Sequence, residues 1–362
     1  MPAPTTIRAV SVERLDIPLF APFGIAGGAQ ETARNLLVTV ELADGTRGYG
    51  EAAPFQAYNG ETQEIARAAV ESAQALVEGA DAREWRRLAA ALRATIGPVG
   101  SAQCAIETAV LDALTRHANM PLWAFFGGVS ARLETDMTIT TGTVDDAFAA
   151  AQDILDRGIR TIKIKIGSGD LTHDLDRVSA VAAVAPQSPL ILDGNAALTP
   201  DDALQLLAQL YERGVRVSLL EQPVAKDNWE GLQQVTYWGG VPVAADETAA
   251  DSSAVLRLIQ ERAAHVVNIK LMKCGVVEAL DIASLCRAAR LRLMIGGNVE
   301  SILGMTTSAC FAAGQGGFDY VDLDTPLFMA ENPFDGGMVY QGAIVDVSQI
   351  AAGHGVTPRD ER

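Results

Sequence analysis

Eight short apolar runs recur along the last two-thirds of the chain at intervals of 24–29 residues, and segments with apolar residues at helical spacing separate them. The runs lie near residues 136–140, 161–166, 190–193, 217–220, 242–245, 266–270, 292–296 and 320–323. A strand that alternates with a helix this regularly predicts a parallel (β/α) barrel. An open doubly wound sheet is the alternative. It is less favoured because the chain has neither a GxGxxG motif after an early strand nor a P-loop.

The first third of the chain has a different pattern. Residues 7–19 and 35–54 alternate apolar and polar residues, whereas residues 62–114 are rich in alanine and show helical spacing. Strands followed by helices predict a separate α+β unit of roughly 120 residues. We expect this unit to span residues 1–125, the barrel to span residues 126–325, and residues 326–362 to pack back on the N-terminal unit.

Three acidic residues, Asp193, Glu221 and Asp246, end consecutive strand-like runs and are separated by 28 and 25 residues. In a parallel barrel the C-terminal ends of the strands share one rim, so these carboxylates are expected to converge. Three hard oxygen donors suit Mg²⁺, and Mn²⁺ is possible in the same cage. Strands on either side carry the lysines Lys163, Lys165, Lys270 and Lys273. A divalent metal flanked by amine bases suits proton removal from a carbon next to a carboxylate.

The composition and net charge disfavour some classes of binding partner and some cellular locations. The net charge is −17 and the sequence pI is about 4.6, which opposes binding to nucleic acid or to anionic membranes. The four cysteines show no metal-like spacing and are expected to be buried free thiols. We see no signal peptide and no apolar run of about 18 residues, so a cytoplasmic protein without a membrane span is expected.

Several motifs in this order resemble the enolase superfamily, and specifically its muconate-lactonizing subgroup, over nearly the whole chain. They are GYGEAAP (48–54), AVLDALTRHANMPLWAFFGG (109–128), KIKIG (163–167), LDGN (192–195), EQP (221–223), ADE (245–247), NIKLMKCG (268–275) and DLD (322–324). The resemblance implies an α+β capping domain, completed by the C-terminal segment, over a modified (β/α)₇β barrel. Proteins of this family often form homo-oligomers, which we expect here.

The resemblance also implies roles for individual residues. Asp193, Glu221 and Asp246 would bind one Mg²⁺ per subunit, and Lys165 and Lys270 would be the bases on opposite faces of the substrate. Lys163 would lie beside Lys165 and lower its pKa. The seventh strand has no histidine, which agrees with two-lysine chemistry. Further candidates are Thr138 and Asn298 for substrate binding, and Asn195 and Glu247 as outer groups that support the metal ligands.

Asp322 and Asp324 lie at the expected end of the eighth strand. Residues two apart on a strand point to the same side, so two carboxylates there would form a receptor for a cationic group. This pair is similar to the one that binds the substrate's α-ammonium in the dipeptide epimerases of the subgroup. A helix cap or a solvated acidic pair is the alternative reading.

Side-chain specificity is expected to depend on the Gly-rich loop near residues 21–28. Epimerases that act on Ala–Glu carry an arginine shortly after the Pro-Phe of this loop, whereas this chain has Gly24 and no basic residue between Arg14 and Arg34. A glutamate side chain would lack its bidentate partner. Neutral or hydrophobic dipeptides are therefore favoured, and cationic ones come second because Glu51 could offer a negative charge.

These observations predict an Mg²⁺-dependent isomerase. It would move a proton at the α-carbon of the C-terminal residue of an L,L-dipeptide through an enediolate. The alternatives within the subgroup are an N-acylamino acid racemase, an o-succinylbenzoate synthase and a muconate cycloisomerase. A catalytically inert barrel used as a binding protein is the remote alternative.

Overall fold

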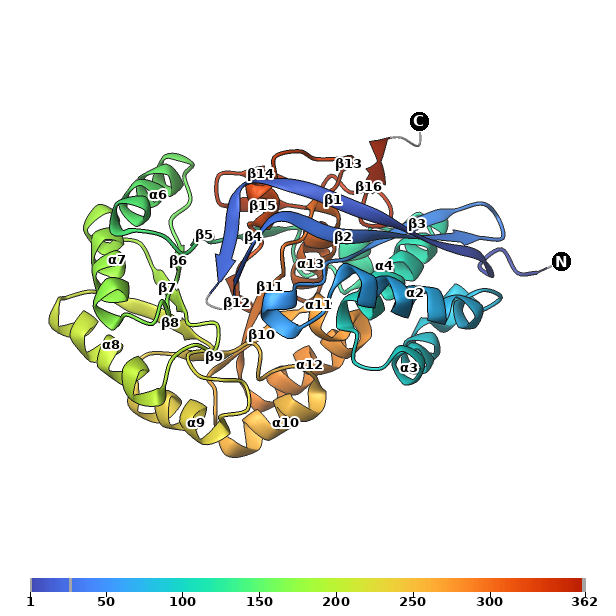
Figure 1. The fold of residues 1–362 in the computed structure, drawn as a ribbon. Helices are drawn as coiled ribbons and strands as arrows, with labels where there is room; N and C mark the ends of the chain where they lie inside the picture. Colours follow the sequence, from blue (N-terminus) through green and yellow to red (C-terminus); the bar gives the residue numbers. More distant parts are fainter. Residues whose placement is uncertain (1, 26–27, 360–362) are drawn as a thin grey trace.

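The computed structural model describes residues 2–25 and 28–359. Its N-terminal part is a three-stranded antiparallel sheet in the order β1-β2-β3, with helices packed on one side (Figure 1). The elements are β1 (Ile7–Ile25), β2 (Gly28–Leu42), β3 (Arg47–Ala52), α1 (Gln56–Asn59), α2 (Gln63–Val77), η1 (Ala82–Glu84), α3 (Trp85–Ile96), α4 (Gly100–His117) and α5 (Leu122–Phe125). This strand-then-helix order agrees with the sequence pattern.

Two glycines bring the sheet and its main helix into close contact. Gly48 and Gly50 on β3 face the backbone of α4, where a Cβ at either position would overlap the carbonyl oxygens of Ala109 and Ala105. Only glycine permits this approach. β3 thereby lies directly on α4 and is held at the junction between the cap and the barrel.

The barrel consists of eight parallel strands that follow one another in sequence order. They are β5 (Met137–Ile139), β6 (Ile162–Lys165), β7 (Leu190–Asp193), β8 (Val217–Glu221), β9 (Val243–Ala245), β10 (Val266–Lys270), β11 (Arg292–Gly296) and β12 (Phe318–Val321). The amide of Asp136, next to β5, donates to the carbonyl of Val321 at 2.9 Å, so the first and last strands lie side by side. A doubly wound sheet would reverse its strand order, and the predicted barrel is confirmed.

Seven helices connect the eight strands and cover the outside of the barrel (Figure 1). They are α6 (Val144–Asp156), α7 (Leu171–Val184), α8 (Pro200–Glu212), α9 (Trp229–Trp238), α10 (Ser252–Glu261), α12 (Val276–Ala289) and α13 (Ile302–Gln315), with the short α11 (Leu271–Cys274) directly after β10. Capping side chains define several helix starts. Thr143, for example, forms a capping box with Asp146 at the start of α6.

The inside of the barrel is apolar in its lower part and charged at its rim. Ile191, Leu219, Ala244, Val266 and Met294 form a small buried cluster between the strands. Residues two positions further along a strand face the same way. The residue after Ile191 on that face is Asp193, and the one after Leu219 is Glu221. The pleat therefore places these two carboxylates above the apolar cluster.

The C-terminal segment contains η2 (Thr325–Phe328), β13 (Phe334–Gly336), β14 (Val339–Gln341), β15 (Ile344–Asp346) and β16 (Val356–Pro358). β15 pairs with β4 (Arg132–Glu134), and the segment also contacts the N-terminal part. Arg116 on α4 donates to the carbonyl of Val356 at 2.7 Å. The segment thus lies against the N-terminal helices as well as the barrel.

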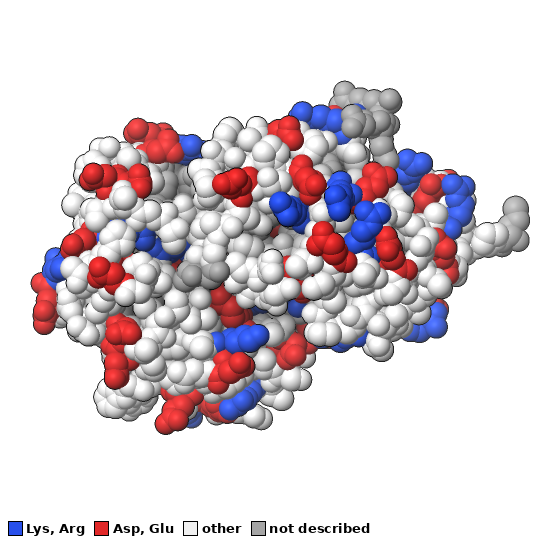
Figure 2. All heavy atoms as spheres, in the orientation of Figure 1, with Lys and Arg blue, Asp and Glu red and all other residues white. Residues whose placement is uncertain are grey.

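Two further expectations concern the chain as a whole. All four cysteines are buried and free, as predicted. In the part of the chain that the structure describes, no helix has the length and apolar character needed to cross a membrane. Acidic and basic side chains are interspersed over the face that Figure 2 presents.

Candidate active site

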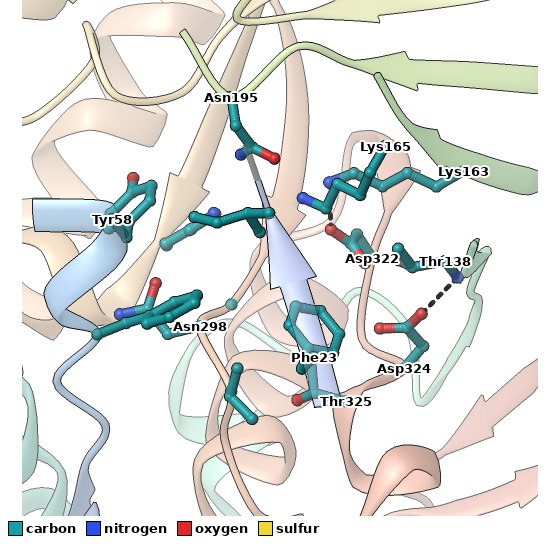
Figure 3. Close-up of a pocket in the computed structure, with 15 residues that line it drawn as sticks. Phe23, Tyr58, Thr138, Lys163, Lys165, Asn195, Asn298, Asp322, Asp324 and Thr325 are labelled. Atoms are coloured by element: carbon teal, nitrogen blue, oxygen red, sulfur yellow. Dashed lines mark hydrogen bonds and ion pairs between the residues drawn. The ribbon is translucent and has the colours of Figure 1, made fainter. Parts of the chain in front are cut away.

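A pocket opens at the C-terminal rim of the barrel strands, beneath the cap (Figure 3). Phe23 and Ile25 reach it from the end of β1, and Tyr58 reaches it from α1. Its other lining residues come from the barrel or its loops, or from the segment just before α1. They are Phe55, Thr138, Lys163, Lys165, Asn195, Lys270, Gly297, Asn298, Val299, Asp322, Asp324 and Thr325. Eight of the predicted site residues therefore line the pocket, whereas the predicted metal ligands Asp193, Glu221 and Asp246 are not among its lining residues.

The three predicted metal ligands lie at the C-terminal ends of three neighbouring strands. Asp193 and Glu221 end β7 and β8 in paired register, and Asp246 follows β9 directly. All three are fully buried. Asp193 Oδ2 and Glu221 Oε2 lie 3.0 and 2.8 Å from the same atom, Lys163 Nζ. Consecutive strand ends thus bring Asp193 and Glu221 to one ammonium group. In the part of the chain that the structure describes, the three carboxyl groups whose oxygens lie within 4.8 Å of one another are instead those of Asp136, Asp322 and Asp324.

The ligand chemistry of these three carboxylates fits a divalent cation. Burial opposes ionisation of Asp193, but Lys163 and Lys165 outweigh it, so the pKa of Asp193 lies below its usual range. Burial and the neighbouring charge of Asp193 raise the pKa of Glu221 above its usual value. Four ammonium groups, those of Lys163, Lys165, Lys270 and Lys273, contact the three carboxylates. A set of carboxylate oxygens is the ligand chemistry that Mg²⁺ prefers.

Lys165 and Lys270 face the pocket from opposite walls. Lys165 ends β6 and Lys270 ends β10, four strands away in a ring of eight. Lys165 Nζ lies 2.6 Å from Asp193 Oδ2, and Lys270 Nζ lies 2.8 Å from Asp246 Oδ2. Each amine is therefore beside one of the predicted metal ligands, on its own side of the pocket. This arrangement can address both faces of a carbon atom held between them.

Asp322 and Asp324 do not lie within the eighth strand, because β12 ends at Val321. Both nevertheless line the pocket. Asp322 Oδ2 pairs with Lys163 Nζ at 2.7 Å, and Asp324 Oδ2 accepts the amide of Thr138 at 2.6 Å (Figure 3). The alternative reading as a helix cap or solvated pair is wrong. Asp324 makes no capping bond to η2, and both side chains are buried.

Lys163 has a more central place than the sequence indicated. Its buried ammonium contacts the carboxylates of Asp193, Glu221 and Asp322. Burial by itself would lower the pKa of Lys163, but these carboxylates raise it well above its usual value. Lys163 is therefore a fixed positive charge that joins the two acidic groups of the site, in addition to its expected place near Lys165.

The remaining predicted residues differ in their surroundings. Asn195 and Asn298 line the pocket, and the Asn298 amide also donates to the carbonyl of Ala53 at 3.0 Å. Glu247 contacts Asn195 at 3.5 Å but borders a neighbouring cleft with Lys273. Burial and the charge of Asp246 raise the pKa of Glu247 to about 8.

Two specificity arguments need correction. Gly24 is not among the described lining residues. Its Cα–H points toward Thr141, where a Cβ would overlap the hydroxyl oxygen, while its neighbours Phe23 and Ile25 enter the pocket. Glu51 is buried at the cap–barrel junction, where Asn35, Ser301 and Gly304 donate to its oxygens, so it offers no free charge to a substrate. Strand alternation explains the first case, whereas only the tertiary contacts explain the second.

Sequence reasoning missed several groups in or beside the pocket. The sequence did not reveal that Phe23, Ile25, Phe55 and Val299 form an apolar wall of the pocket. Phe23 and Ile25 lie on either side of Gly24, in the loop on which specificity was expected to depend, so strand alternation was the available signal for them. Tyr58 places its ring 4.5 Å from Lys270 Nζ and its hydroxyl 3.1 Å from Asp246 Oδ1. The buried Asp136 was missed too, and alternation with Thr138 was its only signal.

Comparison with known proteins agrees with this geometry. The N-terminal domain model of the mandelate racemase/muconate lactonizing enzymes matches residues 7–127, and the enolase C-terminal domain-like model matches residues 146–362. A protein of Herpetosiphon aurantiacus named aromatic dipeptide epimerase is 52% identical over 98% of this chain and 99% of its own. The crystal structure of a mandelate racemase/muconate lactonizing enzyme from Roseiflexus sp. has a TM-score of 0.95 and 62% identity, covering 99% of both chains.

A third relative was solved with ligands. The dipeptide epimerase of Enterococcus faecalis, crystallised with Mg and the dipeptide L-Leu-L-Tyr, has a TM-score of 0.93 and 31% identity. The match covers 97% of this chain and 99% of that one. Both family models and the barrel with its carboxylate and lysine site lead to the same assignment. The chain belongs to the mandelate racemase/muconate lactonizing enzyme family of the enolase superfamily.

Proposed function

We propose that this protein is an Mg²⁺-dependent dipeptide epimerase that inverts the α-carbon of the C-terminal residue of an L,L-dipeptide. The observation that carries the proposal is the pocket itself. Two lysines on opposite walls flank a group of buried carboxylates, and a second acidic pair stands at one end. Relatives named as dipeptide epimerases, at 52% and 31% identity over nearly the whole chain, support the same reaction.

Asp193, Glu221 and Asp246 would hold the metal. When bound there, Mg²⁺ supplies positive charge next to the substrate carboxylate, where negative charge develops as the α-proton leaves. Stabilising this developing charge more than the ground state accelerates the reaction. Mn²⁺ would suit the same oxygen ligands.

The two lysines would exchange the proton. Lys165 takes the α-proton from the L-configured carbon, which leaves an enediolate, and the ammonium of Lys270 returns a proton to the opposite face. Burial opposes the charge of Lys270, but Asp246 and Glu221 outweigh it and hold its pKa above the usual value. Epimerisation needs an acid or base on each face, which explains the paired lysines.

The cap would close the site and select the side chain. Phe23, Ile25, Phe55 and Val299 present apolar surface to the pocket. No arginine lines it among the residues that the structure describes, so a glutamate side chain would find no bidentate partner. Hydrophobic dipeptides, including aromatic ones, are therefore the favoured substrates. The 52% identical aromatic dipeptide epimerase supports this choice.

Incubation of L-Leu-L-Tyr with the Mg²⁺-loaded protein in D₂O tests the proposal. One deuterium is expected at the tyrosine α-carbon together with inversion. Lys165→Ala and Lys270→Ala should each abolish inversion, whereas Lys226→Ala, at an exposed lysine outside the pocket, should retain it. Full epimerase activity in either pocket variant would refute the assigned roles.

The other reactions of the subgroup share the metal and both lysines but need no ammonium receptor. The double variant Asp322→Asn/Asp324→Asn separates them. It should raise the KM of a dipeptide strongly, and should raise the KM far less for N-acylamino acid racemisation, o-succinylbenzoate synthesis or cycloisomerisation, whose substrates bring no ammonium group. An inert binding barrel would be indicated if isothermal titration detected no Mg²⁺ binding. A homo-oligomer and a cytoplasmic location stay predictions, which sedimentation and cell fractionation would test.

A further inference from the structure

Asp136 lies beneath the acidic pair at the end of the pocket. It precedes β5 and faces the same side as Thr138. Its side chain is 1% exposed, and neither carboxylate oxygen has a hydrogen-bond partner within the described residues. One of its oxygens and one oxygen from each of Asp322 and Asp324 all lie within 4.8 Å of one another. Three buried carboxyl groups therefore share one small volume.

This trio is poor in positive charge. Within the described chain, its ion pairs come from Lys163, which contacts Asp322 and is shared with Asp193 and Glu221. Asp324 Oδ1 is buried without a partner. The charged groups that most affect Asp136 are Asp322 and Asp324 after β12, Lys163 on β6 and Glu221 on β8. Close by, the Tyr340 hydroxyl of β14 donates to the carbonyl of Leu323 at 2.5 Å.

Like charges this close cannot all ionise in a buried site. Burial, and then the charges of Asp322 and Asp324, raise the pKa of Asp136 well above its usual value. Burial and Asp322 raise the pKa of Asp324 to about 7. The empty trio is therefore expected to keep a proton near neutral pH. An arriving ammonium group would supply the charge that makes this proton unnecessary.

We propose that Asp136 is a positioning residue of the ammonium receptor, and that the three carboxyl groups share a proton that leaves when a cationic amine enters. The inference rests on the proposed dipeptide function. One O–H bond breaks, the proton passes to solvent, and the substrate ammonium keeps its own three protons. The receptor is thereby fully charged only when occupied. An N-acylated dipeptide brings no charge to replace the proton, so the device selects for a free amino terminus.

Calorimetry measures the proton directly. L-Leu-L-Tyr is titrated into Mg²⁺-loaded Lys165→Ala protein, in which turnover should stop, in two buffers of different ionisation enthalpy at pH 7. We expect release of up to about one proton per bound dipeptide. Asp136→Asn in the same background keeps the shape but has no proton to lose, so release should fall to less than about half. N-acetyl-L-Leu-L-Tyr should release none.

The pH dependence of KM gives a second measurement with both lysines in place. Protonation of the receptor competes with the amine, so KM should rise as the pH falls below about 7. Asp136→Asn removes repulsion from Asp324, which should move this rise about one pH unit lower while kcat is largely kept. Glu107→Gln changes a buried carboxyl group of the cap outside the pocket and is the matched control. It should leave the pH dependence of KM unchanged.

The possible outcomes distinguish the role of Asp136 from the epimerase function on which it rests. Equal proton release with and without Asp136, or no release by the Lys165→Ala protein at any pH from 6 to 8, overturns the role of Asp136 and leaves the epimerase assignment intact. A purely structural role would lower stability and kcat without moving the KM profile, which also overturns it. If no dipeptide is bound or turned over, both proposals are wrong.

Discussion

Lys163 Nζ lies 2.7 Å from Asp322 Oδ2 and links β6 to the turn after β12, the two strands that flank β5. The same ammonium contacts Asp193 and Glu221. One buried side chain thus joins the carboxylates proposed to bind the metal to those proposed to bind the substrate amine. The two acidic groups share the charge of Lys163, so a change of charge in one group alters the electrostatic environment of the other.

Removing the charge of Lys163 should destabilise the folded protein. Lys163→Met leaves buried carboxylates without their cation, which is expected to lower the free energy of unfolding by about 3–5 kcal/mol. Mg²⁺ should restore more stability to the variant than to the parent, because it returns positive charge to Asp193 and Glu221. Urea unfolding with and without Mg²⁺ measures both effects. Arg157→Met, which breaks an exposed pair with Asp153, is the control and should change stability little. Equal stability of parent and Lys163→Met would contradict the linking role.

Tyr58 should support the acid of the reaction from the cap. Tyr58→Phe keeps the ring 4.5 Å from Lys270 Nζ and loses only the bond to Asp246, so kcat should fall less than about tenfold. Tyr58→Leu also loses the ring, and a desolvated cation–π contact of about 1–2 kcal/mol predicts a fall of roughly five- to thirtyfold. Rates of inversion measure the series. The exposed Tyr237 gives the control: its change to leucine should have no effect. Equal rates for the Phe and Leu variants would exclude the ring contact.

Glu107 should make the cap less stable at higher pH. Burial raises the pKa of Glu107 to about 7, whereas an unperturbed glutamate titrates near 4.5. Between these values the folded protein holds a proton that the unfolded chain has lost, so the free energy of unfolding decreases as the pH rises from about 4.5 to 7. The expected contribution is about 3 kcal/mol. Urea titrations from pH 5 to 8 should show a flatter profile for Glu107→Gln than for the parent. Parallel profiles would disprove the assignment.

Residue 24 should act through Thr141. A Cβ at Gly24 would overlap the Thr141 hydroxyl, so Gly24→Ala is expected to displace the end of β1 with Phe23 and Ile25, and to raise KM severalfold. Thr141→Ala alone should change little, and in the double variant it should relieve the overlap. KM values for the four proteins form a double-mutant cycle, with an expected interaction of about 1 kcal/mol. Additive effects would show that the two positions are independent.

The regular features of the fold could be predicted from the sequence alone. Strand alternation, helix spacing and the position of a residue at the end of its run are local properties. The eight strands, the rim placement of Asp193 and Glu221, and the opposed strands of Lys165 and Lys270 follow from them. The order of the motifs was enough to indicate the family.

The contacts between distant segments depended on tertiary structure. Closing the barrel brings Asp136 next to Asp322 and Asp324, and docking the cap buries Glu51 and puts Tyr58 against Lys270. An isolated acidic residue in a sequence carries no sign of whether solvent, a donor or another carboxylate surrounds it. Those surroundings set its charge, and they exist only once the strands have met around the ring.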